Sequence, residues 1–464
     1  MPLSRDADTI AAVATAAGPG GVGIVRLSGP NALVVAARVA SARVSPQEQP
    51  PQTLRRAVVR DPATGEEIDD ILLAVFRAPN SFTGEDVAEL QGHGGDVTLG
   101  RVLAACLRAG ARAARPGEFS ERAFLNGRID LSQAEGVAAL VAAQTVAAQR
   151  AARRQVAGEL SRAVAECGDH LRDALARIEA SIDFPEEVGE IDRAAVDRAL
   201  ESAQGRVGDL LATFDYGRRL SDGVTVVLVG RPNVGKSSLL NALSGRERAI
   251  VTEVAGTTRD VIEEALNFNG VPVRALDTAG IRETEDPVER IGVARAREAV
   301  ETADVVVAVL DATTGWTPGD ARLLEELGSR PLVVAANKAD AADPGPTVAA
   351  ARAALTGRVA EVVATAAPEP GGIEPLRSAL GGILGSEGAA SASPAVVISA
   401  RHAAALGEAE RSLAAARRTL GEEGPAELIA VDAHGALQSL GQITGETARE
   451  EVIAGIFSRF CIGK

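Results

Sequence analysis

The sequence has few cysteines and few aromatic residues. Its three cysteines, Cys106, Cys167 and Cys461, are scattered along 464 residues, which excludes a disulfide framework or a cysteine-based zinc site. Phe, Trp and Tyr make up only 2% of the chain, whereas apolar residues as a whole make up 46%. Buried cores must therefore consist mainly of Ala, Val and Leu, which favours helices and closely packed elements. A chain of this length is expected to form two to four domains.

The chain also lacks an excess of positive charge and long apolar runs. The net charge of -15 argues against a protein that binds nucleic acid mainly by electrostatics, although it allows a local basic patch. No apolar run approaches the roughly 18 residues that indicate a membrane span, and the N-terminal residues lack the charged start and apolar core of a signal peptide. We therefore expect a cytoplasmic protein with no membrane contact.

Two of the cysteines fall within helical apolar patterns. Cys106 follows Leu99, Val102 and Leu103 at helical spacing. Cys167 belongs to a longer series with the same spacing, which comprises Leu160, Val164, Cys167, Leu171, Leu175, Ile178 and Ile182. This spacing is typical of the buried stripe of a helix. Both thiols are predicted to be core residues, which leaves Cys461 as the candidate reactive thiol.

Residue patterns divide the chain into four segments. Residues 1–118 mix short apolar runs, including a predicted strand at 71–76, with Gly-rich turns, and indicate an α+β domain. Residues 119–217 and 385–464 show helical periodicity, with a break near Phe184 and Pro185. Helices with one apolar face need partners, so these two segments are predicted to pack together as one discontinuous helical domain.

Residues 218–384 are predicted to form an open α/β domain inserted into the helical one. Three continuous apolar runs, at 224–229, 305–310 and 332–336, are typical of parallel strands that are buried on both faces. Helical stretches separate these runs.

A phosphate-binding loop follows the first of these strands. Residues 230–237 (GRPNVGKS) match the pattern GxxxxGK[ST] between a strand and an apolar helix. Glycines let backbone N–H groups converge on phosphates, and the helix N-terminus adds partial positive charge. Lys236 is expected to contact the β- and γ-phosphates, and the Ser237 hydroxyl is expected to bind Mg²⁺.

Two further motifs identify the nucleotide. Residues 277–280 (DTAG) follow a strand and place Asp277 for the magnesium shell and the Gly280 N–H for the γ-phosphate. Residues 337–340 (NKAD) end a buried strand, and the Asp340 carboxylate can accept hydrogen bonds from guanine N1–H and the exocyclic amine. Adenine offers no such pair of donors, so the three motifs together predict GTP as the substrate.

Two loops are expected to complete this site. Residues 256–260 (GTTRD) occupy the position of a first switch, with Thr258 as the second magnesium ligand; a simple polar turn is the alternative. A further base-contacting element is expected near residues 364–367 (ATAA), which depart from the usual Ser-Ala-Lys.

Hydrolysis needs a source of transition-state stabilisation other than a glutamine. The position after DTAG, where small GTPases carry a water-orienting Gln, is Ile281, which cannot hydrogen-bond to water. Asn233 could instead hold a monovalent cation, and Glu289 could position water. Candidate arginine fingers are Arg259, Arg282 and Arg290, although each could equally be a solvated surface charge.

With these motifs in place, nearly the whole chain resembles the MnmE (TrmE) family of tRNA-modification GTPases. The resemblance rests on a set of short motifs, which are residues 20–24 (GGVGI), 79–87 (PNSFTGEDV), 91–95 (QGHGG), 115–126 (RPGEFSERAFLN) and 460–464 (FCIGK).

The resemblance implies an N-terminal domain that dimerises and binds a tetrahydrofolate, a helical domain, and an inserted Ras-like P-loop domain whose hydrolysis requires K⁺ and face-to-face pairing of two such domains. It implies Asn233, Thr252, Val254 and Thr257 as potassium ligands, and it matches Glu289 to the family's water-orienting glutamate. Arg282 is a further catalytic candidate. The expected nucleotide-binding residues are Asn233, Val234, Gly235, Lys236, Ser237, Ser238, Thr252, Glu253, Val254, Ala255, Gly256, Thr257, Thr258, Asp277, Thr278, Ala279, Gly280, Asn337, Lys338 and Asp340.

The resemblance further implies a site for a 5-formyl- or 5,10-methylene-tetrahydrofolate. The matching residues are Arg26, Glu89, Arg128 and Lys464. Arg26 or Lys464 suits the cofactor's carboxylates and Glu89 the pterin amino group, whereas Arg128 stands where the family commonly has Lys, which changes the geometry.

In the family, an FAD-containing partner, MnmG (GidA), acts with the GTPase in a heterotetramer-type complex. Together they place an aminomethyl-type group on C5 of the wobble uridine of certain tRNAs, using the folate one-carbon unit. Cys461 is either a nucleophile toward the uracil ring or a small residue that packs the chain end. Two other functions stay open, namely a ribosome-assembly GTPase, for which we find no basic stripe with interleaved aromatics, and a GTP-gated binding scaffold.

Overall fold

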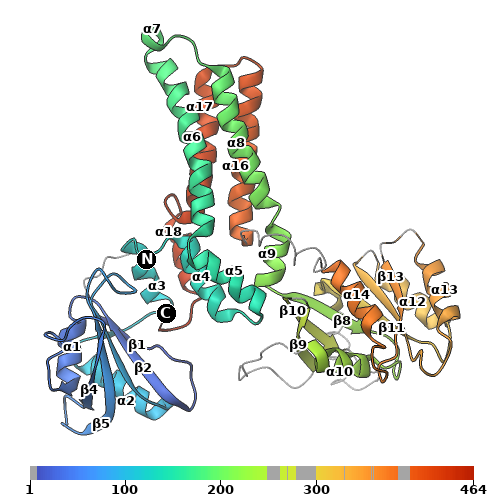
Figure 1. Ribbon diagram of the computed structural model, residues 1–464, viewed down its shortest axis with the longest axis horizontal. Helices are drawn as coiled ribbons and strands as arrows, with labels where there is room; N and C mark the ends of the chain where they lie inside the picture. The colour runs from blue at the N-terminus through green and yellow to red at the C-terminus, as the bar shows by residue number, and fades with distance from the viewer. Residues whose placement is uncertain are drawn as a thin grey trace. The chain divides into compact units, whose positions relative to one another are not determined.

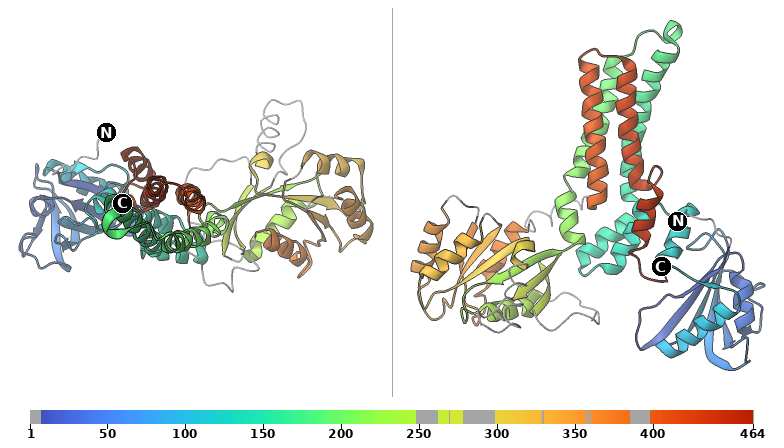
Figure 2. Two further views of the ribbon diagram at one scale, coloured as in Figure 1. Left: turned by 90° about the horizontal axis from the view of Figure 1, so that it is seen from above. Right: turned by 180° about the vertical axis from the view of Figure 1, so that it is seen from behind.

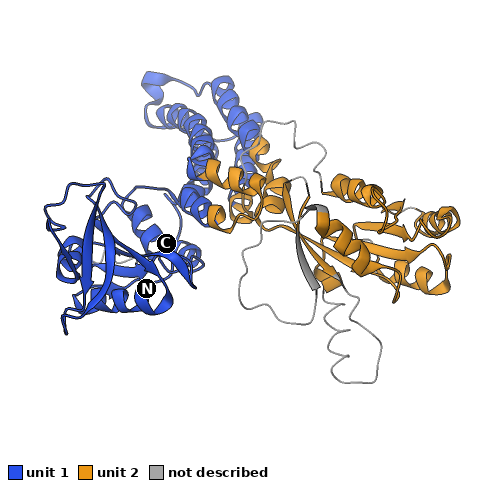
Figure 3. Ribbon diagram, turned by 60° about the horizontal axis from the view of Figure 1, so that its bottom comes forward, with its two compact units in different colours: residues 1–138, 156–207, 405–464 blue, residues 139–155, 208–404 orange. Residues whose placement is uncertain are grey.

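The computed structural model describes residues 8–247, 262–268, 270–277, 299–328, 330–356, 358, 360–384 and 398–463. The chain divides into two compact units (Figure 3). Unit 1 contains residues 1–138, 156–207 and 405–464, and unit 2 contains residues 139–155 and 208–404. The boundaries between the four segments expected from the sequence remain a prediction, because this two-part division does not separate the N-terminal segment from the helices.

Unit 1 begins with a seven-stranded sheet in the order β3-β4-β5-β6-β2-β1-β7. Its strands are β1 (Ile10–Val13), β2 (Gly20–Ser28), β3 (Ala40–Ala42), β4 (Thr53–Arg60), β5 (Glu67–Phe76), β6 (Val87–Gly94) and β7 (Arg112–Ala113). β5 contains the strand predicted at 71–76 but begins four residues earlier. All neighbouring strands are antiparallel except β1 and β7.

The two faces of this sheet are covered differently. Helices α1 (Ala32–Val39) and α2 (Asp96–Arg108) share one apolar core with inward-facing residues of the sheet, and Cys106 lies in it as predicted. On the other face, Phe119 of α3 (Glu118–Leu125) packs on Ile10 and Ala12 of β1. An α+β fold for this region is thereby confirmed.

The rest of unit 1 is helical. The long helices α6 (Glu159–Asp183), α8 (Arg193–Leu211), α16 (Ala400–Gly421) and α17 (Ala426–Thr444) lie side by side as a bundle (Figures 1 and 2). α6 ends one residue before Phe184, and the short α7 (Pro185–Val188) follows, so the predicted break is confirmed. Cys167 is fully buried in α6, as its spacing predicts. Because α6 packs on α17, the two helical segments of the sequence do join.

Unit 2 contains a six-stranded sheet in the order β13-β12-β11-β8-β10-β9. Its strands are β8 (Val224–Val229), β9 (Ile262–Phe268), β10 (Val271–Asp277), β11 (Val305–Asp311), β12 (Leu332–Asn337) and β13 (Ala360–Ala364). Only the β9–β10 pair is antiparallel. The three apolar runs predicted as buried parallel strands are β8, β11 and β12.

Helices cover both faces of the second sheet. Apolar residues of α10 (Lys236–Glu247) and α14 (Glu374–Ile383) share a core with Val226 and Leu228 of β8. Residues of α12 (Pro318–Glu326) and α13 (Gly345–Ala354) share the opposite core with Val227 and Val229. This alternation confirms the predicted α/β insertion. The remaining helices are α4 (Leu131–Ala142), α5 (Val146–Val156), α9 (Phe214–Ser221) and α18 (Glu450–Phe457).

Within the described residues, no helix combines the length and apolar character needed to cross a membrane.

A buried ionic network attaches α3 to the sheet of unit 1. Glu118 accepts hydrogen bonds from the Arg112 guanidinium at 2.6 Å and from the Arg115 N–H at 2.7 Å. Arg122 lies 3.2 Å from Glu118 and 2.5 Å from Asp8. The side chain of Glu118 is only 2% exposed, so its charge is buried. Burial would by itself raise the pKa of Glu118, but these hydrogen bonds outweigh it and hold the pKa below its ordinary value.

We predict that this carboxylate stabilises unit 1 at neutral pH. Because its folded-state pKa is lowered, its contribution is present above the unfolded pKa of about 4.3 and is lost as pH falls through the folded pKa. Glu118→Gln should lower the thermal unfolding midpoint at pH 7, at a cost of about 1–3 kcal/mol. The difference from the wild type should shrink toward pH 3.

The matched control is Glu121→Gln. Burial raises the pKa of Glu121 above its ordinary value, with the Arg115 charge opposing it, so its ionised form is disfavoured by folding. This variant should not lower the midpoint at pH 7. Equal losses in both variants would contradict the assigned role of Glu118.

Candidate functional site

The phosphate loop joins β8 to α10 in unit 2. Gly230 and Gly235 have φ angles of 152° and 99°, a region that favours glycine. A Cβ atom on Gly230 would overlap the Val309 carbonyl oxygen, and one on Gly235 would overlap the Asn337 amide nitrogen. Asn233 also has a positive φ, of 63°. At Gly230 and Gly235 the loop therefore follows a path that a residue with a Cβ atom could not adopt without overlap.

Lys236 lies over this loop. Its Nζ donates hydrogen bonds to the carbonyl oxygens of Gly230 at 2.8 Å and Arg231 at 3.0 Å, and the residue is 5% exposed. A buried ammonium group held at the first turn of α10 places positive charge where the loop's N–H groups and the helix N-terminus also favour an anion. The predicted phosphate contact of Lys236 fits this position.

The second residue of the loop has a structural role. The Arg231 guanidinium binds both carboxylate oxygens of Asp320, at 2.9 and 3.3 Å. Asp320 is 1% exposed and also closes a capping box with Thr317 at the start of α12. This fork-to-fork ion pair fixes the outer side of the loop. It was not apparent from the sequence, because nothing in the motif identifies a partner 89 residues away.

Asn337 joins the phosphate loop to the predicted base-recognition loop. Its side-chain amide donates to the Val234 carbonyl oxygen at 2.9 Å and accepts a hydrogen bond from the Thr365 hydroxyl at 3.2 Å. The Thr365 carbonyl in turn accepts from the Ala339 N–H at 3.0 Å. Residues 364–367, predicted as the further base-contacting element, thus lie beside residues 337–340.

Lys338 binds a carboxylate that the sequence analysis did not identify. Its Nζ lies 2.6 Å from Asp311 Oδ2, and Thr313 donates to the other oxygen of Asp311. Burial would raise the pKa of Asp311, but the hydrogen bonds from Lys338 and Thr313 hold it below its ordinary value. Asp311 could have been found by its position at the end of a buried strand. Asp340, in contrast, is exposed at the outer end of its loop.

Parallel strands bring these groups to one edge of the sheet. β8 lies between β10 and β11. The carboxyl end of β8 leads to the phosphate loop, β10 ends at Asp277 and β11 ends at Asp311. β12 ends beside β11 with Asn337 paired to Asp311. In open α/β sheets ligands bind at this edge, where the connections from neighbouring strands diverge. The backbone of Asp277 ends β10 at this edge, and its role in a magnesium shell remains a prediction.

Several predicted residues lie outside the described part of the chain. They are the switch and catalytic candidates Thr252, Glu253, Val254, Ala255, Gly256, Thr257, Thr258, Arg259, Thr278, Ala279, Gly280, Arg282, Glu289 and Arg290, and the folate candidate Lys464.

In unit 1, two of the predicted folate residues are already paired with each other. Arg26 on β2 and Glu89 on β6 face one another in register, and their side chains form an ion pair at 2.9 Å. Gln91 donates to the second oxygen of Glu89 at 3.1 Å. The Arg26 guanidinium also lies 5.7 Å from the centre of the Phe119 ring and 3.5 Å from the Gly463 carbonyl oxygen. This brings the pair beside the residue that precedes Lys464.

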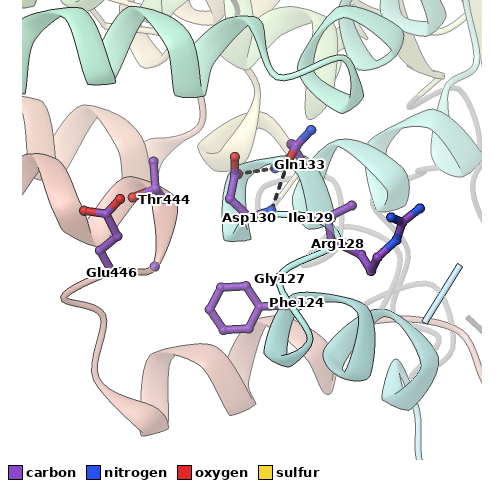
Figure 4. Close-up of a pocket in the computed structure, with 9 residues that line it drawn as sticks. Phe124, Gly127, Arg128, Ile129, Asp130, Gln133, Thr444 and Glu446 are labelled. Carbon is purple, nitrogen blue, oxygen red and sulfur yellow. Dashed lines mark hydrogen bonds between the residues drawn. The ribbon is translucent and has the colours of Figure 1, made fainter. Parts of the chain in front are cut away.

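Arg128 lines a separate cavity of about 430 Å³. The cavity lies between the α3–α4 connection and the end of α17, and Figure 4 shows Arg128 and Glu446 on opposite sides of the Phe124 ring. Gly445 has a φ of 97°, and a Cβ there would lie 2.7 Å from Phe124. Among the described contacts, Arg128 has none with Arg26 or Glu89, and its place in a shared folate site remains a prediction.

The three thiols differ in exposure. Burial raises the pKa of Cys106 to about 12 and that of Cys167 to about 11, so both are protonated and unreactive at neutral pH. Cys461 is exposed, and packing at this point is provided by its neighbour Phe460, which is buried in a cluster with Phe457. Whether Cys461 acts as a nucleophile remains a hypothesis.

Comparisons with known proteins cover the whole chain. Residues 9–128 match the family model described as GTP-binding protein TrmE N-terminus, and residues 131–461 match the MnmE helical domain. Three curated relatives are each named tRNA modification GTPase MnmE. The chain is 44% identical to the protein of Nostoc sp. strain PCC 7120 (98% of this chain, 99% of the relative), 45% identical to that of Moorella thermoacetica (98% and 99%), and 46% identical to that of Synechococcus sp. strain JA-2-3B'a(2-13) (100% of both).

We predict that Asn337 couples the two nucleotide-binding loops. Asn337→Ala would leave the buried Val234 carbonyl and Thr365 hydroxyl without this partner, at about 1–3 kcal/mol, so affinity for GDP should fall at least about fivefold. Isothermal titration calorimetry measures this change. Thr365→Val, which removes only the second bond, should have a smaller effect, and an unchanged affinity in Asn337→Ala would refute the coupling.

Proposed function

The chain belongs to the MnmE family of tRNA modification GTPases, and we propose that it hydrolyses GTP to support modification of C5 of the wobble uridine in certain tRNAs. The enzyme is a GTP hydrolase by family membership. The finer reaction, addition of an aminomethyl-type group from a folate one-carbon unit together with an FAD-containing partner of the MnmG (GidA) type, is our proposal.

Family membership supports the role in tRNA modification, and the link that Asn337 forms between the phosphate loop and the NKAD loop supports binding of a guanine nucleotide. It sets the spacing between the anion-binding N–H groups and Asp340. A guanine nucleotide has its triphosphate and its N1–H and amine at two ends, and these loops offer matching groups at both. Asp340 is exposed and can therefore accept the base without first breaking a buried contact.

Bound Mg²⁺ would neutralise charge on the β- and γ-phosphates. Ser237 in the first turn of α10 and Thr258 are the proposed ligands, with Asp277 at the neighbouring strand end holding the ion's shell. The hydroxyl and carboxylate oxygens of these residues suit a hard cation. Lys236, held at the carbonyl oxygens of Gly230 and Arg231, would contact the β- and γ-phosphates.

We also propose K⁺ as the second cation. Ile281 cannot orient water, so the site needs another positive group near the γ-phosphate. Asn233 is exposed on the loop in a left-handed conformation, and its amide oxygen is a suitable ligand for a monovalent cation. Thr252, Val254 and Thr257 are the other proposed ligands, Glu289 the water-orienting group, and Arg282 a further catalytic candidate.

The Arg26–Glu89 pair fits a folate. A ligand that displaces this ion pair must satisfy both charges, since a charge left alone in a half-buried site is costly. The amino-pyrimidine edge of a pterin can donate to Glu89, and a glutamate tail offers carboxylates to Arg26. Arg128 and Lys464 are the remaining proposed contacts. The site would thus hold a 5-formyl- or 5,10-methylene-tetrahydrofolate.

The proposed working form is a homodimer that combines with the FAD-containing partner and tRNA in the cytoplasm. Because the chain carries a net charge of -15, we assign most of the contact with tRNA phosphates to the partner or to local basic patches.

The proposed function predicts a specific change in tRNA. In cells that lack this chain, mass spectrometry of tRNA nucleosides should show unmodified C5 at wobble uridines. The wild-type gene should restore the modification, whereas Lys236→Ala and Asp340→Asn should not, because they lose phosphate and guanine recognition respectively. Unchanged nucleosides in the deletion strain would remove the modification role while leaving GTP hydrolysis intact.

The potassium site predicts a selective ion response. Replacing K⁺ with Na⁺ should reduce GTP turnover by at least about tenfold, a change in barrier of about 1.4 kcal/mol, without an equal loss of GDP affinity. Asn233→Ala should abolish the difference between the two ions. Slow turnover that does not depend on the ion would instead favour a GTP-gated scaffold.

A further inference from the structure

One end of the helical bundle in unit 1 forms a distinct surface. We call it the bundle tip and define it as residues 183–192, around α7, and residues 422–432, around the start of α17 (Figure 1). Arg193 joins the two segments, because its guanidinium donates to the carbonyl oxygens of Leu420 at 3.0 Å and Gly424 at 3.1 Å. Both segments therefore lie at the same end of the bundle.

The bundle tip carries a high density of negative charge. Its carboxylates are Asp183, Glu186, Glu187, Glu190, Asp192, Glu422, Glu423, Glu427 and Asp432, and neither segment contains Lys, Arg or His. No ion pair of these carboxylates occurs within the described parts of the chain, although Asp192 caps α8 through the Ala195 N–H. Like charges at this density repel one another, so Lys or Arg side chains from another molecule would relieve the repulsion on binding.

Exposed apolar side chains lie among these carboxylates. Phe184 and Val188 are both 56% exposed, Leu428 is 54% exposed and Val431 is 65% exposed. Leu428 and Val431 are three residues apart on α17 and point away from the buried Ile429 and Ala433. A group of large apolar residues surrounded by charge is typical of a protein interface.

Charge decides what this surface can bind. Nucleic acid is disfavoured, because RNA phosphates would face nine carboxylates, whereas the Arg193 guanidinium is already bonded to two carbonyl oxygens. Two bundle tips would repel each other for the same reason. The complementary occupant is a protein surface with Lys or Arg residues around an apolar patch.

We propose that the bundle tip docks the FAD-containing partner protein through such a basic, apolar-centred surface. This inference rests on the proposed function, which requires that partner. It assigns the partner's contact to the helical bundle of unit 1.

The test measures binding of the full-length chain to the purified flavoprotein by calorimetry at two salt concentrations. Glu186→Lys/Glu187→Lys and, separately, Leu428→Ser/Val431→Ser should each weaken binding at least about tenfold. The charge variant should also reduce the salt dependence of binding, since screening acts on the attraction that it weakens. GTP turnover of the chain alone should stay unchanged in both.

Matched controls lie on other surfaces of the chain. Glu408→Lys/Glu410→Lys makes the same charge change on α16, roughly 20 Å from the tip at 1.5 Å per residue. Val97→Ser/Val452→Ser removes two exposed apolar residues from α2 and α18. Both controls should bind the flavoprotein as the wild type does.

Three outcomes would overturn the proposal. Wild-type affinity in both tip variants would show that the partner docks elsewhere, with the proposed function intact. Loss of tRNA binding or of self-association, without loss of flavoprotein binding, would assign the tip to another occupant. No binding between the wild-type chain and the flavoprotein would remove the partner from the proposed function and this docking surface with it.

Discussion

The nucleotide site depends on one side-chain amide that ties two loops together. Asn337 lies 103 residues from Val234 in the sequence, yet its hydrogen bond to that residue fixes the phosphate loop against the end of β12. Gly235 allows this approach, because any larger residue would overlap the same amide. The contacts from Thr365 to Asn337 and from Ala339 to Thr365 extend this link to the base-recognition loop. A neutral amide suits the role, since it both donates and accepts without placing a charge in a buried position.

The sequence predicts the elements of unit 2 well because its strands are buried on both faces. Uninterrupted apolar runs identify β8, β11 and β12, and the glycines of residues 230–237 identify the turn between β8 and α10. The sequence does not reveal which polar side chains form hydrogen bonds with each other. Asp311 and Asp320 belong to no motif, and their partners Lys338 and Arg231 come from other strands and loops. Such pairs become visible only once the sheet order is known.

Unit 1 shows a different limit of sequence reasoning. Helical periodicity places Cys167 in a core and ends α6 before Phe184, and the structure confirms both. The resemblance to a family identifies Arg26 and Glu89, but it does not indicate that they bind each other across β2 and β6. Sequence motifs therefore identify the polar residues of this sheet, whereas the strand register determines which of them pair with each other.

The contact between Arg26 and Gly463 affects the order in which parts of the fold can be completed during translation. These residues lie 437 positions apart, and Gly117 likewise donates its N–H to the Cys461 carbonyl oxygen. During translation the residues of the first sheet emerge long before residues 461–463. The contacts of Arg26 and Gly117 with these residues can therefore form only after the inserted GTPase segment has been synthesised. A chain truncated by a handful of C-terminal residues would keep the residues of its nucleotide site but lose the contacts of Arg26 with Gly463 and of Gly117 with Cys461. Such a truncation would therefore alter unit 1 without removing any part of unit 2.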